Sequence, residues 1–183
     1  MQSIILIGPM RAGKTTVSKL VAEKLNLPRV RLDEIRWDYY PTVGYDEDHA
    51  KSLRKSGGLD FFTYMKPFEA SLVEHVLTLH PEDTVIDFGA GHSVYEQEAL
   101  FQQVQKALEP FPHVIYITPC SDVEEAVEIL NQRDIDDGES GLPAELNRHF
   151  VTHPSNSILA THTIYNQDQT PAQSAEQIVR LLG

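Results

Sequence analysis

The sequence predicts a three-layer α/β fold, in which helices cover both faces of a five-stranded parallel sheet. Short apolar runs recur along the 183-residue chain and alternate with helical patterns, as expected for strands joined by helical crossovers. The first run leads into a glycine-rich turn that a helical pattern follows, an arrangement typical of a buried parallel strand. The expected strands are residues 4–7, 30–32, 84–88, 114–118 and 161–165.

Residues 8–15, directly after the first expected strand, match the P-loop spacing G-x-x-x-x-G-K-[ST]. A strand, a glycine-rich turn and a helix in this order point backbone N–H groups and the positive end of a helix dipole at one spot, which suits phosphate. In this pattern Lys14 reaches the β- and γ-phosphates, and the Thr15 hydroxyl is placed for Mg²⁺. We therefore predict that the chain binds a nucleoside triphosphate together with Mg²⁺. The expected nucleotide-binding residues are Gly8, Arg11, Ala12, Gly13, Lys14, Thr15 and Thr16.

Two later helices carry start signals of their own. Ser121 and Glu124 have the spacing of a capping box ahead of a helical apolar pattern. Thr170, Pro171 and Gln173 combine an N-cap, a first-turn proline and a glutamine at the third helical position. We expect a helix to begin at each place.

Two segments interrupt the alternation of strands and helices. Residues 34–80 read as a long, mostly helical insertion, and residues 134–142 are polar with two glycines. In a phosphoryl-transfer enzyme such segments would bind the acceptor and form a lid, because the closed site must exclude water. A plain acidic surface loop is an equal alternative for residues 134–142. Both segments belong to one expected domain, residues 1–183, which is long enough for a substantial core.

The composition is that of an ordinary globular protein, with 41% hydrophobic and 23% charged residues. The formal charge of −12 opposes a nucleic-acid partner, which would require clustered Lys and Arg. A single cysteine excludes an intrachain disulfide, and no apolar stretch is long enough to span a membrane. We expect no cleavable signal, a cytoplasmic protein, and a monomer or weak homodimer.

Further motifs follow the P-loop at defined distances. The matching segments are residues 7–16, residues 20–27, Asp33, Met65-Lys66-Pro67-Phe68-Glu69, Gly89-Ala90-Gly91, residues 160–164 and residues 170–171. In this order they resemble the shikimate kinase family of the nucleoside-monophosphate-kinase-like P-loop kinases, over nearly the whole chain. The resemblance implies an ATP-dependent kinase whose acceptor is a hydroxyl group of a small molecule. It implies acceptor-binding roles for Asp33, Lys66, Gly89, Ala90, Gly91 and Arg148, and a catalytic role for Lys14, Asp33 and Arg133.

Three positions depart from the family pattern. The first aspartate of the family's Asp-x-Asp, which supports Mg²⁺, is Arg31 here, and the family's acceptor-binding arginine is Lys66. A lysine is a point charge and lacks the planar two-pronged contact that an arginine makes with a carboxylate. The family's glycine triplet has gained a methyl group at Ala90. We therefore expect a small polar metabolite other than shikimate as the acceptor.

Because Arg31 stands where the family has the aspartate that supports Mg²⁺, another carboxylate is needed beside Thr15 to support the metal ion. The candidate is Asp87, at the end of the third expected strand. An unpaired charge beside a buried strand is costly without a cation, which favours the metal role. The alternative is that Asp87 caps the turn at Gly89.

Three further residues have both a functional and a structural interpretation. Asp33 would hold the acceptor hydroxyl and take its proton late in the transfer, or would cap the helix that follows it. Arg133 would neutralise charge on the transferred phosphoryl group, or would complement the helix dipole. Arg148 would bind the acceptor, or form a surface salt bridge.

His92 follows the glycine turn directly and could touch a substrate. The aromatic residues Trp37, Tyr39, Tyr40 and Tyr45 begin the insertion and would form either an acceptor wall or core. Two other functions therefore stay open. One is a nucleoside or nucleoside-monophosphate kinase that stacks its acceptor on these rings, and the other is a nucleotide-binding regulator with little catalysis.

Overall fold

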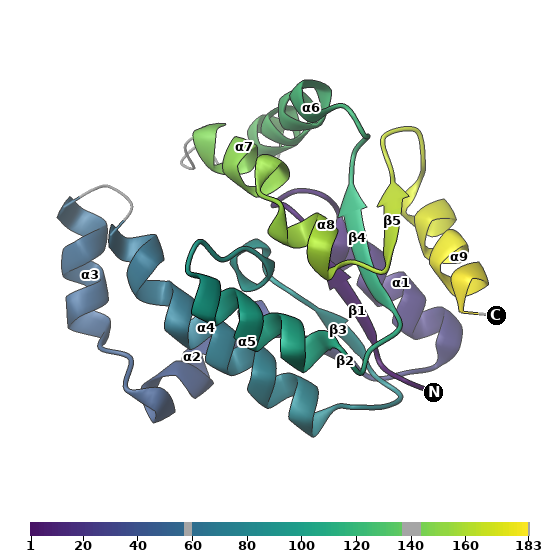
Figure 1. Ribbon diagram of the computed structural model, residues 1–183. Helices are drawn as coiled ribbons and strands as arrows, with labels where there is room; N and C mark the ends of the chain where they lie inside the picture. Colours follow the sequence, from purple (N-terminus) through teal and green to yellow (C-terminus); the bar gives the residue numbers. More distant parts are fainter. Residues whose placement is uncertain (57–59, 137–143, 183) are drawn as a thin grey trace.

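A computed structural model describes residues 1–56, 60–136 and 144–182 (Figure 1). Five parallel strands form one sheet in the order β2-β3-β1-β4-β5, so the predicted fold class is confirmed. Strands β2 and β3 therefore lie on one side of β1, and β4 and β5 lie on the other side. In open α/β sheets, ligands bind where the strand order reverses in this way, outside the carboxyl ends of the strands. The strands are β1 Ile4–Ile7, β2 Arg29–Arg31, β3 Val85–Asp87, β4 Val114–Thr118 and β5 His162–Tyr165.

Helices cover both faces of the sheet (Figure 1). Helices α1 and α9 pack together on one face, and α4 and α5 pack together on the other face. The α-helices are α1 Lys14–Leu25, α2 Leu32–Tyr39, α3 Glu47–Ser56, α4 Asp60–Leu79, α5 Glu98–Leu108, α6 Val123–Asp136, α7 Ala144–Thr152, α8 Ser155–Leu159 and α9 Pro171–Leu181. Two short 3₁₀ turns, η1 Tyr40–Val43 and η2 Ala90–Ser93, complete the described elements.

The central strand β1 shows why the sheet is buried on both sides. All four of its side chains are fully buried. Ile5 and Ile7 pack into the hydrophobic core that includes α4, whereas Ile4 and Leu6 pack into the core that includes α1 and α9. Continuous apolar runs are typical of parallel strands because helices cover both faces.

Most sequence-predicted boundaries agree with the structure, and the start of α6 is a correction. The Thr170 capping box is confirmed, since its hydroxyl accepts from the Gln173 N–H. At α6, however, the capping side chain is Asp122, whose Oδ1 accepts from the Glu125 N–H at 2.9 Å. The predicted Ser121–Glu124 box is therefore one residue too early. Asp and Ser are both strong N-caps, so adjacent candidates cannot be separated by residue type alone.

The long segment between β2 and β3 is mostly helical, as predicted, and holds α2, α3 and α4 (Figure 1). Tyr40 is fully buried in the core, whereas Trp37 is 45% exposed. The aromatic residues thus divide between core and surface. Of the predicted lid at 134–142, residues 134–136 continue α6 and the rest lies outside the described residues.

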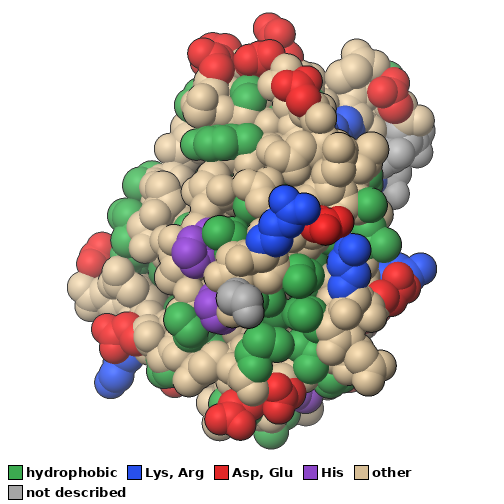
Figure 2. All heavy atoms as spheres, turned by 90° about the vertical axis from the view of Figure 1, so that its right-hand side faces the viewer, with side chains coloured by type: hydrophobic (Ala, Val, Ile, Leu, Met, Phe, Trp, Pro, Cys, Tyr) green, Lys and Arg blue, Asp and Glu red, His purple; other side chains and the backbone are tan. Residues whose placement is uncertain are grey.

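The face that carries β5 and α9 shows how the acidic excess is distributed. In Figure 2 acidic side chains gather at the upper and lower ends of this face, and Lys and Arg side chains are few. This face therefore has no basic stripe of the kind that binds nucleic acid. Among the described residues, no helix has the length and apolar character needed to cross a membrane.

Candidate active site

The P-loop wraps from the end of β1 to the start of α1, as the motif predicts. Gly8 and Gly13 adopt φ angles of 141° and 89°, which side-chain-bearing residues rarely tolerate. A Cβ atom at Gly8 would also overlap the Ile117 carbonyl oxygen of β4. Tight packing against the neighbouring strand thus requires glycine here.

A hollow of about 490 Å³ lies over this loop at the carboxyl end of the sheet. P-loop residues that the sequence predicts to bind the nucleotide line one part of this hollow, and the end of helix α6 lines another part. Its lining residues are Arg11, Gly13, Lys14, Thr15, Thr16, Arg133 and Asp136.

Lys14 is buried at the base of the loop. Its Nζ donates to the Pro9 carbonyl oxygen at 2.8 Å, so the ammonium group is held inside the curve of the loop. Burial lowers the pKa of Lys14, and the charges of Asp87 and Asp33 oppose this effect. A buried cation at the amino end of a helix is the electrostatic environment that a polyphosphate needs.

Asp87 ends β3 and is only 4% exposed. Its Oδ2 accepts from the Ser18 hydroxyl at 3.2 Å, and the Thr15 side chain also bonds to it. Burial raises the pKa of Asp87, while Lys14 and these hydrogen bonds oppose the rise. The carboxylate therefore faces the first turn of α1, beside the Thr15 hydroxyl. These two hard oxygen donors fit a magnesium site.

Arg31 of β2 lies against the same carboxylate. Register places Arg31 directly beside Asp87 on the neighbouring strand, and the Arg31 Nε is 3.6 Å from the Asp87 Oδ2. A further ion pair joins Arg31 to Glu34 of α2. Where the family pattern has an acidic group, β2 thus carries a guanidinium, which lies beside the Asp87 carboxylate of β3.

Asp33 lies in the first turn of α2, at the carboxyl end of the sheet. Arg31 occupies the N-cap position, so Asp33 does not cap this helix. Its Oδ1 pairs with Arg36 at 3.0 Å. A Cβ atom at Gly89 would overlap the Asp33 carboxylate, so this carboxylate lies directly against the glycine turn. The structure thus brings together Asp33 and Gly89, as the resemblance implied.

Lys66 of α4 is buried and donates two hydrogen bonds. Its Nζ donates to Glu69 Oε2 at 2.7 Å and to the Gly91 carbonyl oxygen at 2.8 Å. The same ammonium lies 5.3 Å from the centre of the Tyr95 ring. A Cβ atom at Gly91 would overlap the Glu69 carboxylate, so the turn and α4 lie in close contact. Lys66 therefore ties α4 to the glycine turn.

Two residues that are not among the predicted site residues, Asn166 and His92, contact the P-loop and the insertion, respectively. Asn166, just after β5, donates its Nδ2 to the Ala12 carbonyl oxygen at 2.7 Å and so holds the P-loop from the opposite side. Nothing in the sequence around Asn166 signals this contact. His92 is 1% exposed, and its Nε2 is 3.3 Å from the Tyr40 hydroxyl. Its Nδ1 has no hydrogen-bond partner among the described residues.

Burial lowers the pKa of His92 below its ordinary value of 6.5, with Glu69 and Asp33 opposing and Arg36 and Lys66 adding to the shift. Just below pH 6.5 the unfolded chain therefore binds more protons than the folded chain. We expect the free energy of unfolding to decrease as the pH is lowered through this range, by up to about 1.4 kcal/mol per pH unit. Urea unfolding of wild type and His92→Gln at about pH 7.5 and about pH 5.5 measures this. A smaller loss for His92→Gln is expected, and equal losses would contradict the prediction.

Arg133 and Arg148 differ in surroundings. Arg133 lines the hollow, and its Nη1 donates to the Arg11 carbonyl oxygen at 3.1 Å. Arg11 in turn donates to Asp134 Oδ1 at 2.9 Å, so the end of α6 is joined to the P-loop. Arg148 pairs at 2.5 and 2.6 Å with both oxygens of Glu124 on the exposed surface of α6 and α7.

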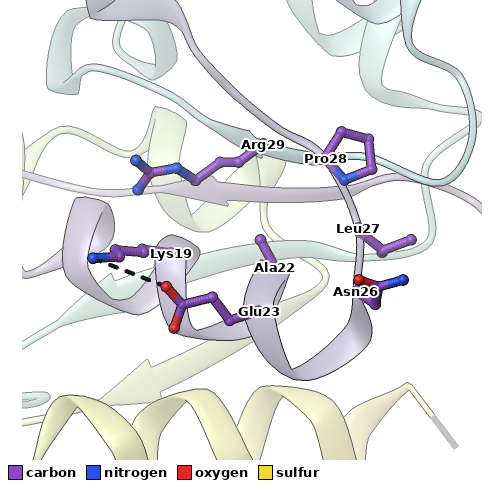
Figure 3. Close-up of a pocket in the computed structure, with 7 residues that line it drawn as sticks. All are labelled: Lys19, Ala22, Glu23, Asn26, Leu27, Pro28 and Arg29. Atoms are coloured by element: carbon purple, nitrogen blue, oxygen red, sulfur yellow. Dashed lines mark ion pairs between the residues drawn. The ribbon is translucent and has the colours of Figure 1, made fainter.

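A second hollow of about 460 Å³ lies along the other end of α1 (Figure 3). In Figure 3 Arg29 runs back toward Lys19, while Leu27 and Pro28 lie at the opposite end. Lys19 pairs with Glu23 at 3.9 Å across the helix surface. The hollow has no P-loop residue in its lining, so it is separate from the phosphate-binding site.

Known proteins similar to this chain share its sequence pattern and fold. No protein-family model matches the sequence. Shikimate kinase of Chlamydia pneumoniae is 29% identical over 157 residues, which are 86% of this chain and 76% of that protein. The pentafunctional AROM polypeptide of Schizosaccharomyces pombe is 36% identical over 89 residues, which are 49% of this chain and 5% of that protein.

Solved structures show the same architecture. Shikimate kinase from Acinetobacter baumannii, in complex with shikimate, superposes with a TM-score of 0.71 at 21% identity, covering 100% of this chain and 93% of that one. The Mycobacterium tuberculosis APS kinase CysC, in complex with AMPPNP and APS, gives a TM-score of 0.57 at 14% identity, covering 99% and 96%. At these identities the likeness is one of fold.

The sheet order, the P-loop at the end of β1 and the buried Lys14 are those of a P-loop nucleotide-binding fold, and the sequence similarity to shikimate kinase supports the class of P-loop kinases. Within this class the chain is shikimate kinase-like in sequence, as its similarity to the chlamydial enzyme shows, and its fold agrees with this. The resemblance inferred from the motifs is therefore confirmed.

Proposed function

We propose that this chain uses ATP and Mg²⁺ to phosphorylate a hydroxyl group of a small polar metabolite other than shikimate. The observation that carries this proposal is the convergence of three groups at the carboxyl end of the sheet. Lys14 is buried in the P-loop, and Asp87 lies beside the Thr15 hydroxyl. Asp33 lies against the glycine turn, and both carboxylates are near enough to influence the pKa of Lys14.

The nucleotide side consists of the P-loop and the end of α6. Backbone N–H groups of the P-loop after Pro9 bind the phosphates, and Lys14 contributes a positive charge at the β- and γ-phosphates. Thr15 and Asp87 would hold Mg²⁺, which supplies charge neutralisation on the phosphate oxygens. Arg133 faces the same hollow and would neutralise charge on the transferred phosphoryl group.

The acceptor side consists of α2 and the glycine turn. Phosphoryl transfer passes through a loose transition state, so positioning of the hydroxyl matters more than the basicity of its partner. Asp33 orients the hydroxyl and accepts its proton late in the transfer. Arg36 pairs with the Asp33 carboxylate, which lies directly against the turn at Gly89.

Lys66 supports an acceptor other than shikimate. The family contacts the carboxylate of its acceptor with an arginine at this position, whereas the Lys66 ammonium already donates to Glu69 and Gly91. A buried lysine with two partners offers an acceptor neither a free charge nor a two-pronged contact. Ala90 adds a methyl group on the same turn, which lies close to Glu69.

Acceptor-dependent ADP production tests the proposal. Metabolites are first screened by the thermal shift that they add in the presence of a non-hydrolysable ATP analogue, since ligand binding raises the melting temperature. Hits are then assayed for ADP release with ATP and Mg²⁺. A polyol or sugar derivative that increases ADP release supports the proposal. Stimulation by nucleosides or nucleoside monophosphates alone would identify a different kinase, and nucleotide binding without stimulation by any hit would favour a regulator.

A further inference from the structure

Two arginines on β2 give the phosphate site an unusual charge. Arg29 and Arg31 are two residues apart, so both side chains point to the same face of the sheet, toward α1. The Arg29 Nη1 donates to the Thr15 carbonyl oxygen at 2.8 Å and to the Ser18 hydroxyl at 3.3 Å. Arg31 lies against Asp87, as described above. Both guanidinium groups therefore lie beside the first turn of α1.

The buried Asp87 carboxylate has two protein cations acting on it. Lys14 and Arg31 both act on the Asp87 carboxylate, Asp33 also acts on Lys14, and Glu34 pairs with Arg31. The Glu34 side chain is 61% exposed, so water screens its charge, while Asp87 is buried. The amino end of α1 adds further positive charge. The buried Asp87 carboxylate is thus compensated by protein cations before any metal ion binds.

A divalent cation at Asp87 would compete with this arrangement. Arg31 already neutralises the carboxylate that Mg²⁺ would use, and two positive charges on one carboxylate repel each other. Bound phosphates, in contrast, gain from each cation that is fixed in place before they arrive.

We propose that Arg31 supplies at Asp87 part of the positive charge that Mg²⁺ normally supplies, so that nucleotide binding by this chain depends only weakly on Mg²⁺. The inference rests on the nucleotide site of the proposed function. It concerns the binding step, and phosphoryl transfer still uses the metal ion. Arg31 is a positioning and charge-supplying residue for the bound nucleotide.

The experiment measures the dissociation constant of ADP by calorimetry, with saturating Mg²⁺ and with EDTA, for wild type and Arg31→Gln. The quantity compared is the ratio of the constant in EDTA to the constant in Mg²⁺. For wild type we expect a ratio of about ten or less. In EDTA, the Arg31→Gln protein lacks a positive charge near the bound ADP, so its dissociation constant should rise. In Mg²⁺, the metal ion no longer competes with a guanidinium for Asp87, so binding should not weaken in the same way. The ratio for Arg31→Gln should therefore be at least about fivefold higher than that for wild type.

Two control variants make the result specific. Arg180→Gln removes the same charge from an exposed position on α9, where Arg180 pairs with Glu176, and should keep the wild-type ratio. Arg31→Lys keeps the charge and should stay within about twofold of wild type. An Arg31→Gln ratio less than about fivefold above that of wild type would overturn the inference.

Failure of the inference and failure of the proposed function have different signatures. If wild type binds ADP and Arg31→Gln does not change the ratio, the nucleotide site stands and the role of Arg31 falls. If wild type binds ADP under neither condition, the inference falls together with the proposed function on which it rests. Should Arg31→Gln not fold, as judged by circular dichroism, the wild-type ratio decides, and a value above about ten overturns the inference.

Discussion

Replacing Lys14 with alanine is expected to abolish phosphoryl transfer and to weaken nucleotide binding. The Lys14 ammonium donates to the Pro9 carbonyl oxygen inside the P-loop and is therefore already in position. It does not have to move when negative charge develops on the phosphates in the transition state. Loss of one such preorganised group typically reduces kcat by about 10²- to 10³-fold, or about 3–4 kcal/mol. ADP release in the presence of an acceptor measures the first effect, and calorimetric titration with ADP measures the second.

Lys19→Ala is the matched control for this variant. Lys19 is on the same helix, but its side chain is 64% exposed and pairs only loosely with Glu23 at 3.9 Å. Removing an exposed charge in such a pair changes stability by about 0.5 kcal/mol or less, so Lys19→Ala should keep wild-type turnover. Undiminished turnover of a folded Lys14→Ala protein would end the kinase proposal.

The sequence predicted the central part of the fold well because its signals are local and strong. Runs such as Ile4-Ile5-Leu6-Ile7 are buried on both sides and can be recognised without knowledge of their partners. The P-loop is equally local, because its glycines, lysine and threonine are adjacent in the chain. The α6 cap was missed by one residue, since Ser121 and Asp122 are both good caps and only the backbone geometry separates them.

The site could be predicted only in part, because its remaining contacts depend on register and on distant segments. The Arg31–Asp87 pair requires that β2 and β3 are neighbours with these two residues side by side. The contact of Asn166 with Ala12 joins positions 154 residues apart, and no local pattern announces it. In contrast, Asp33 could be placed from its distance to the P-loop. Its proximity to Gly89 agrees with that placement, while its catalytic role stays a prediction.

Replacing Asp33 with asparagine is expected to stop acceptor phosphorylation while leaving the affinity for ADP near its wild-type value. The substitution keeps the shape of the side chain and removes its negative charge and its ability to accept the hydroxyl proton. A positioned group of this kind contributes about 10²- to 10⁴-fold to the rate. The nucleotide contacts of the P-loop are made by other residues, so the two effects should separate.

Asp38→Asn on the same helix α2 is the matched control, because it makes the same chemical change at an exposed position. Folding is checked by thermal denaturation, ADP affinity by calorimetry, and transfer by ADP release with the identified acceptor. The comparison also tests the Arg36 contact, since Asp33→Asn leaves Arg36 without its charged partner. If the folded Asp33→Asn protein lost ADP binding as well as transfer, Asp33 would belong to the nucleotide side. The acceptor would then have to bind elsewhere than between α2 and the glycine turn.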